Sequence, residues 1–306
     1  MRLCLMIEGQ EGVTWSQWVD LARACERSGL EGLFRSDHYT SFLGNPSGAL
    51  DAWATISALA ATTARIRLGS LVSPATFRHP SVLARMAVTA DHISGGRVEL
   101  GLGAGWNEQE HVQSGFPFPP LAERLALFAE QLEIIRRSWA PGPFDFIGAH
   151  HVLRDANPLP KPLGALNLIV GGSAKSGTLE PAARFADEYN TGAVSPREAA
   201  RRRAAVAAAC ERAGRPPLTF SLMTQCVVGG DRPSLERRLE RIVELTGVDP
   251  RERRDVTLIG TVDEVAEKLR AYEEAGVERV MLQHLLHDDL EMVELLGREV
   301  APRVAA

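Results

Sequence analysis

Short apolar runs alternate with segments of helical period along almost the whole chain. In the helical segments apolar residues recur every three to four positions, and the stripe Leu125, Phe128, Leu132 and Ile135 is one example. Repeated strand–helix units of this kind predict a parallel sheet covered by helices, which is the α/β class. Eight runs are expected to form strands: 2–7, 32–35, 66–72, 98–103, 167–170, 188–191, 219–228 and 279–282.

Local signals support this division of the chain. Thr14 is placed to cap a helix over 15–28, and Gly29 follows directly after its expected end. Segment 141–163 is rich in Pro, Gly and aromatic residues and interrupts the alternation after the fourth βα unit, where we expect a small hairpin. The sequence therefore predicts a (β/α)8 TIM barrel with one insertion, forming a single domain over residues 1–306.

Composition narrows the range of partners. The formal net charge is -5, with 34 basic and 39 acidic residues spread through the chain, so no basic patch is expected to attract nucleic acid. No apolar run approaches the roughly 18 residues needed to span a bilayer, and the first segment becomes polar too early for a secretion signal. Four widely spaced cysteines without a CxxC pair argue against a disulfide or zinc framework. We expect a cytoplasmic protein that acts on a small molecule.

The loops after the strands carry the chemistry in catalytic barrels. After the second strand come Asp37 and His38, and His is the side chain that exchanges protons most readily near neutral pH. The alternative is a structural imidazole held by the neighbouring carboxylate. After the third strand, Ser70 and Ser73 are candidate hydroxyl donors, or parts of an ordinary strand end with a turn at Pro74.

Two glycine-rich strand ends follow. Alternate glycines at 101, 103 and 105 would let a flat ligand approach the backbone, although Trp106 argues against a dinucleotide-binding turn. Before a later helix, amides of a glycine turn suit a phosphate, with an ordinary turn as the alternative. The residues expected to hold this phosphate are Gly171, Gly172, Ser173 and Lys175, joined by the hydroxyl of Thr191.

Near the C-terminus, His284 and His287 precede Asp288 and Asp289. Their spacing is compatible with metal ligands, but no further ligand cluster is visible, so a polar rim with an aspartate capping the next helix is the preferred interpretation. We expect no metal site.

Five segments together resemble the luciferase-like monooxygenase superfamily, and in particular its branch of coenzyme F420-dependent oxidoreductases. They cover nearly the whole chain: SDHY at 36–39, LGSLVSPATFRHP at 68–80, DHISGGRVELGLGAGWNEQEH at 91–111, IVGGSAKSGTLEPAARFADEYNTG at 169–192, and LIGTVDEVAEKLRAYEEAGVERVMLQHL at 258–285.

The resemblance implies a site. Members of the family carry a non-prolyl cis peptide behind the central cofactor ring, which by position would join Ser70 to Leu71 here. His38 would lie at the reacting face with Asp37, the expected catalytic pair. The cofactor would be held by Asp37, Ser70, Leu71, Ser73, Asn107, Gly171, Gly172, Ser173, Lys175 and Thr191.

The resemblance also implies a reaction, namely hydride transfer between coenzyme F420 and a small organic substrate, in a homodimer. Two alternatives stay open: an FMN-dependent monooxygenase that uses oxygen and a partner flavin reductase, and a non-catalytic flavin-binding protein. Only three of the 34 basic residues are lysines, a composition typical of GC-rich genomes, which often encode F420. Trp106 stands where related sugar-phosphate dehydrogenases carry a glutamate, so a sugar phosphate is a poor expectation. Substrate choice should depend on loops 40–48 and 141–163.

Overall fold

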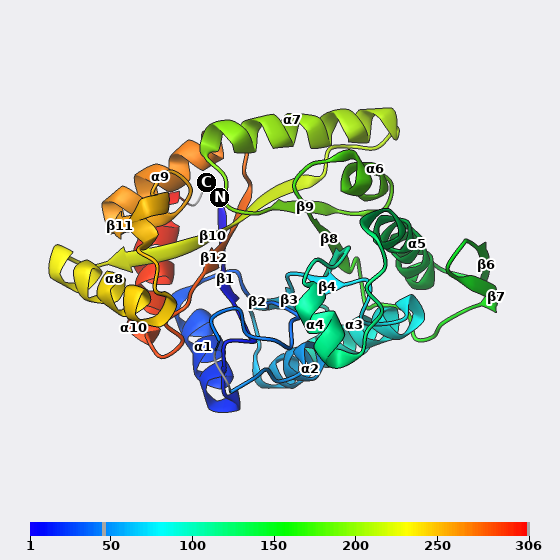
Figure 1. Ribbon diagram of the computed structural model, residues 1–306, viewed down its shortest axis with the longest axis horizontal. Coiled ribbons are helices and arrows are strands. Elements are labelled where there is room, and N and C mark those ends of the chain that lie inside the picture. The colour runs from blue at the N-terminus through cyan, green and yellow to red at the C-terminus, as the bar shows by residue number, and fades with distance from the viewer. Residues whose placement is uncertain (45–46, 305–306) are drawn as a thin grey trace.

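Eight parallel strands close into a barrel in the computed structural model, which describes residues 1–44 and 47–304 (Figure 1). Each strand pairs with the next around the ring, and the last pairing, between β9 and β10, closes it. The predicted TIM barrel is confirmed. The ring consists, in spatial order, of β1 (Arg2–Ile7), β2 (Gly32–Arg35), β3 (Arg67–Ser70), β5 (Val98–Gly103), β8 (Asn167–Gly171), β9 (Glu188–Thr191), β10 (Thr219–Gly229) and β12 (Arg279–Gln283).

Helices cover the outside of the barrel (Figure 1). Thr14 caps the first of them, and Gly29 ends it with a φ of 91°, both as predicted. Within the described residues, no helix is both long and apolar enough to cross a membrane. The helices are α1 (Trp15–Ser28), α2 (Ala52–Thr62), α3 (Pro80–Ser94), α4 (Glu108–Ser114), α5 (Leu121–Trp139), α6 (Ser176–Phe185), α7 (Pro196–Arg212), α8 (Arg232–Thr246), α9 (Val262–Glu274), α10 (Leu290–Leu295), a π turn (Leu296–Val300) and α11 (Ala301–Val304).

Three elements differ from the sequence prediction. The third strand ends at Ser70, and the chain forms a separate short strand, β4 (Ser73–Pro74), which pairs with β5 in place of a simple turn. An additional strand, β11 (Leu258–Thr261), pairs with the end of β10 outside the ring. The helix expected after Asp288 and Asp289 changes to a π turn after Leu295.

The insertion at 141–163 forms the expected small hairpin, β6 (Phe144–Ile147) and β7 (Val152–Ala156). Its turn is held by the Glu130 carboxylate of α5, which accepts the backbone amides of Ala149, His150 and His151. Figure 1 shows this hairpin at the periphery, beside α5 and away from the barrel axis. In the other loop expected to select the substrate, 40–48, residues 45 and 46 lie outside the described residues.

Apolar side chains form two cores. The larger one lies between the strands and the helices, and a small one fills the barrel itself with Cys4, Met6, Phe34, Ile169 and Met281. This division follows from the alternation of side chains along each parallel strand. The interior packing leaves the carboxyl ends of the strands as the place for a site.

A buried charge network closes the opposite end of the barrel. Arg279, fully buried at the start of β12, donates to Glu99 Oε2 at 2.7 Å and to Glu188 Oε2 at 3.1 Å. Burial raises the pKa of Glu99, but the guanidinium groups of Arg279 and Arg67 outweigh it and lower that pKa to about 2. Burial raises the pKa of Glu188 above its ordinary value. Arg279 thus bridges two interior carboxyl groups, and Arg67 adds a second cation to Glu99.

Replacing Arg279 should destabilise the barrel. Arg279→Met leaves Glu99 and Glu188 buried without their common partner, and we expect the free energy of unfolding to fall by about 3–5 kcal/mol. Urea denaturation followed by circular dichroism measures it. Arg212→Met, which breaks an exposed pair with Glu180, is the control. A loss no larger than that of the control would show that the network contributes nothing to stability.

Candidate functional site

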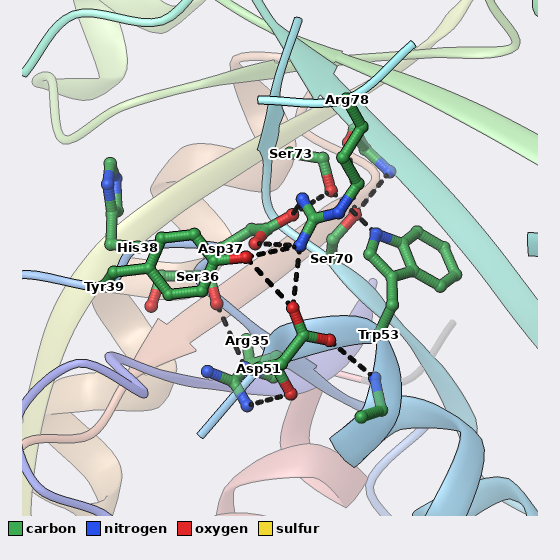
Figure 2. Close-up of polar contacts among 12 residues, drawn as sticks. Arg35, Ser36, Asp37, His38, Tyr39, Asp51, Trp53, Ser70, Ser73 and Arg78 are labelled. Atoms are coloured by element: carbon green, nitrogen blue, oxygen red, sulfur yellow. Dashed lines mark hydrogen bonds and ion pairs between the residues drawn. The ribbon is translucent and has the colours of Figure 1, made fainter. Parts of the chain in front are cut away.

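Asp37 is the centre of a buried polar cluster where β2 and β4 end (Figure 2). Its carboxylate has no solvent exposure and accepts from Arg78 at both oxygens, Nη1 to Oδ2 at 2.6 Å and Nη2 to Oδ1 at 3.2 Å. The Ser73 hydroxyl donates to Oδ2 at 2.6 Å. Because both oxygens are engaged, this geometry suits an anchoring role for Asp37; its catalytic role stays a prediction.

Arg78 joins this cluster to the start of α2. Its Nη2 also donates to the Tyr39 hydroxyl and to Asp51 Oδ2, each at 2.9 Å, while Asp51 caps α2 through the Ala54 amide. Burial lowers the pKa of Arg78, but Asp37, Tyr39 and Asp51 raise it more, so its pKa lies above the ordinary value and the side chain stays cationic. The sequence contains Arg78 within the motif at 68–80, but the side chain's role became visible only from these contacts.

Trp53 of α2 also holds the cluster around Asp37, through Ser73. Its indole Nε1 donates to the Ser73 hydroxyl at 3.0 Å, so this hydroxyl accepts from Trp53 and donates to Asp37 (Figure 2). Both hydrogen-bonding capacities of this buried hydroxyl are therefore used inside the protein. Ser73, predicted to hold the cofactor, is engaged in fixing the cluster around Asp37.

His38 stands apart from this cluster in Figure 2. Its side chain is 12% exposed, and its Nδ1 lies 2.7 Å from Glu110 Oε2. The rings of Phe42 and Trp106 contact it edge-on, with centroid distances of 4.9 Å and 5.7 Å. The imidazole is therefore held at one nitrogen and flanked by aromatic rings at the carboxyl end of β2.

Glu110 lies within the motif at 91–111, but the sequence alone did not indicate its contacts. The side chain is fully buried, and Oε1 accepts from the Tyr39 and Thr40 amides. Burial raises the pKa of Glu110, but hydrogen bonds from His38 and these amides outweigh it, so the pKa lies below its ordinary value. Glu110 is therefore a buried anion paired with His38.

Asn107 sets the position of Glu110. Its side chain accepts the Glu110 amide at 3.4 Å and so caps α4, and its carbonyl accepts Nδ1 of His111 at 2.6 Å. The other nitrogen of His111 lies 2.6 Å from the Thr76 hydroxyl. Asn107, predicted to hold the cofactor, is thus engaged in capping α4.

The non-prolyl cis peptide lies one residue later than predicted. It joins Leu71 to Val72, and the predicted position between Ser70 and Leu71 is wrong. The Leu71 amide still donates to the Arg35 carbonyl at 2.7 Å, so regular pairing with β2 extends one residue beyond Ser70. The Ser70 hydroxyl donates to the Gly101 carbonyl at 3.1 Å and therefore stabilises the barrel wall.

Val72 occupies the space beside the glycine-rich strand end. A Cβ at Gly101 would lie 2.8 Å from Val72 Cγ1, one at Gly103 2.7 Å from Cγ2, and one at Gly171 3.1 Å from Cγ1. These separations are shorter than ordinary contacts. The glycines make room for Val72, where the sequence suggested room for a flat ligand.

The predicted phosphate turn is partly satisfied within the protein. The Gly172 amide donates to the Asn190 carbonyl at 3.0 Å, and the Ala174 amide donates to the Tyr189 hydroxyl at 2.9 Å. These two amides are not available to a phosphate. The side chains of Ser173 and Lys175 are exposed, and in the described chain the N-terminus of α6 has no side-chain cap.

A cation lies beside the other predicted tail residue. Arg202 of α7 donates to the buried Thr191 hydroxyl at 2.7 Å. The sequence offered no signal for this contact, because Arg202 is one of several arginines in its helix. Arg202 also pairs with Glu198 at 2.8 Å, so the positive charge where β8 and β9 end comes chiefly from Lys175 and the uncapped α6 N-terminus, which suits an anionic group.

The two C-terminal histidines are buried. Burial lowers the pKa of His284 to about 3 and that of His287 to about 4, so both are neutral at physiological pH. Asp289 accepts the Met292 amide at 3.0 Å and pairs with Arg238, which confirms the capping interpretation. Among the described residues, no group of three or more His, Cys, Asp or Glu side chains could hold a metal.

Fold and site together define a TIM barrel with a histidine–carboxylate pair at its mouth. The family model of luciferase-like monooxygenases matches residues 4–279, so the chain belongs to that family. Pyrimidine monooxygenase RutA of Stutzerimonas stutzeri (strain A1501) is 33% identical over 172 residues, 54% of this chain and 47% of the relative. The chain thus spans about half the length of that relative. An F420-dependent glucose-6-phosphate dehydrogenase of Rhodococcus erythropolis is 24% identical over 94% of this chain and 93% of its own.

Solved structures agree on the fold. An F420-dependent secondary alcohol dehydrogenase, in complex with an F420-acetone adduct, has a TM-score of 0.84 at 19% identity and covers 100% of this chain and 99% of its own. The oxygenating constituent of 3,6-diketocamphane monooxygenase from Pseudomonas putida, in complex with FMN, has a TM-score of 0.77 at 20% identity with the same coverage. At these identities the likeness shows the fold alone.

The packing of Val72 against the glycines can be tested by a double-mutant cycle. A methyl group at residue 103 would contact Val72 alone. We therefore expect Gly103→Ala to lower the free energy of unfolding by about 1–3 kcal/mol, and by far less when Val72 is also alanine. Urea denaturation of the four proteins measures the coupling.

Gly101→Ala is the matched control. Its Cβ would lie 2.3 Å from the Ser70 carbonyl oxygen, which Val72→Ala does not remove. The loss of unfolding free energy should therefore persist when Gly101→Ala is combined with Val72→Ala. If Val72→Ala restored the stability of both glycine variants equally, the assignment of Val72 to this space would be contradicted.

Proposed function

We propose that this protein is an oxidoreductase that transfers hydride between coenzyme F420 and a small organic substrate. The observation that carries the proposal is the pair of His38 with the buried Glu110 at the carboxyl ends of the strands. An imidazole there is suited to exchange a proton with a substrate oxygen near neutral pH. Support for F420 comes from the Rhodococcus relative, whose match extends over 94% of this chain.

The described residues fit such a cofactor. The chain at Leu71 and Val72 would support the ring, and Asp37, with the cluster around it, would hold this support from behind. Ser173, Lys175 and the α6 N-terminus would bind the phosphate of the tail, with Thr191 and Arg202 beside them. An anionic tail is favoured there because the side chains are cationic and the helix dipole is positive.

Each side chain then has a definite task. A bound deazaflavin supplies a carbon that accepts or donates hydride, and it does not readily activate oxygen. His38 takes the proton of a substrate hydroxyl, or returns it to a carbonyl oxygen in the reverse direction. Phe42 and Trp106, which flank the imidazole, would offer apolar surface to the substrate. Trp106 provides no carboxylate, so acid–base work falls to His38.

A second candidate is an FMN-dependent monooxygenase. It is favoured by the match to RutA, a monooxygenase that is 33% identical over 54% of this chain. The same phosphate contacts would hold FMN, and such an enzyme would take reduced flavin from a partner reductase. The cofactor therefore has to be determined by binding.

Titration of the purified protein with F420 and with FMN, each followed by calorimetry, tests the order of these candidates. We expect F420 to bind more tightly, and turnover of the bound cofactor with at least one member of a panel of secondary alcohols and aldehydes. Tight binding of FMN without binding of F420 would reverse the order. Binding of F420 without turnover of any substrate would favour a non-catalytic protein.

His38→Ala should separate binding from chemistry. We expect kcat to fall by about 10²- to 10⁴-fold, the usual contribution of a general acid or base, while cofactor affinity is retained. His92→Ala is the control, because His92 is exposed at the far end of α3, where it contacts the Lys161 carbonyl. An unchanged kcat in His38→Ala would remove His38 from the mechanism.

A further inference from the structure

We infer that Glu110 is a positioning residue that fixes which nitrogen of His38 carries hydrogen and thereby presents Nε2 to the substrate. The inference rests on the proposed function of His38. It adds a residue outside the expected catalytic pair, which joined His38 to Asp37. In the structure Asp37 is bound to Arg78 and Ser73, whereas the carboxylate on the His38 ring is Glu110.

The hydrogen bonds around Glu110 have only one consistent direction. The Tyr39 and Thr40 amides can only donate, so Oε1 accepts from both. An ionised carboxylate has no hydrogen to give, so at the 2.7 Å contact Nδ1 of His38 is the donor and Oε2 the acceptor. Nδ1 therefore carries the hydrogen, and in the neutral imidazole Nε2 presents a lone pair.

That lone pair is what proton abstraction requires. When the substrate O–H bond breaks, its proton bonds to Nε2 and the electron pair stays on the substrate oxygen. The imidazolium that forms keeps its Nδ1 hydrogen bond to Glu110, which is stronger once the ring is charged. In the reverse direction Nε2 returns the proton.

Glu110 is held rigidly enough for this task. Its side chain is fully buried, and its helix, α4, is capped by Asn107. The next residue, His111, contacts Thr76 in the loop after β4 at 2.6 Å. Through Tyr39 and Thr40, Glu110 also fixes the segment that follows His38. The imidazole is consequently oriented from its own loop and from α4.

A second histidine–carboxylate pair shows what distinguishes this one. His151 Nδ1 lies 3.0 Å from Glu130 Oε2, but this pair anchors the β6–β7 hairpin, and its ring faces His79 at 5.2 Å. The pair at His38 lies at the end of a barrel strand, beside Phe42 and Trp106. The pairing alone also occurs at His151, so the positioning role is assigned to Glu110 because its pair with His38 lies at the end of a barrel strand.

Glu110→Gln reverses the direction of the hydrogen bond between residue 110 and His38 and changes the shape of the side chain only slightly. Its amide oxygen still accepts from Tyr39 and Thr40, so its NH2 group faces Nδ1 of His38. Nδ1 must then accept, and the hydrogen moves to Nε2. We expect kcat to fall by about 10²- to 10⁴-fold, as for loss of a general base, while KM changes little.

Nitrogen NMR provides a readout that needs neither cofactor nor turnover. With ¹⁵N-labelled histidine, the two ring nitrogens of His38, assigned by their loss in His38→Gln, report the tautomer in cofactor-free protein at alkaline pH. We expect hydrogen on Nδ1 in the unaltered protein and on Nε2 in Glu110→Gln. Glu110→Asp, which keeps the carboxylate, should keep the original tautomer if the Gln variant fails to fold.

Two matched controls isolate the effect. Glu108→Gln makes the same charge change on the exposed face of α4, and Glu130→Gln alters the other histidine–carboxylate pair. Both should leave the His38 tautomer and kcat unchanged. An unaltered His38 tautomer in Glu110→Gln, or an inverted tautomer with unchanged kcat, would overturn the inference. Absence of turnover in the unaltered protein would instead overturn the proposed function, and the tautomer result would still stand.

Discussion

The ion pair between Asp37 and Arg78 is the interaction on which the site depends. A carboxylate without solvent exposure is costly unless it is paired and hydrogen-bonded, and here Arg78 and Ser73 satisfy both oxygens. The same guanidinium contacts Asp51 at the start of α2. One buried cation therefore joins the ends of β2 and β4 to a helix, and the backbone direction of Asp37 leaves His38 on the other side, toward Glu110.

The two ends of the barrel differ in how their charged side chains are buried. At the amino ends of the strands, Arg279 neutralises Glu99 and Glu188 within a closed network, with apolar side chains such as Phe34 above it. At the carboxyl ends, the buried charges lie in the wall, and His38 remains partly exposed. A rigid base and wall thus support the partly exposed His38 at the mouth, an arrangement suited to proton exchange with a bound molecule.

The hydrophobic pattern was sufficient to predict most of the barrel, because the strands of the ring bury most of their residues. It failed where contacts decide the structure: β3 ends early because Val72 enters the space beside the glycines, and β11 forms on the edge of β10. The strand-end rule placed Asp37 and His38 correctly at the mouth. Their partners Arg78 and Glu110 lie 41 and 72 residues away in the chain, and no local pattern indicates such a pairing.

The most direct measurement of the central claim is the coupling energy between Asp37 and Arg78. Asp37→Asn and Arg78→Met, singly and together, give a double-mutant cycle of unfolding free energies from urea denaturation. Since the two groups form one buried pair, the account predicts a coupling of about 1–3 kcal/mol, with the double variant more stable than the sum of the single losses implies. Losses that add to within about 0.5 kcal/mol would contradict it, because independent sites behave in that way.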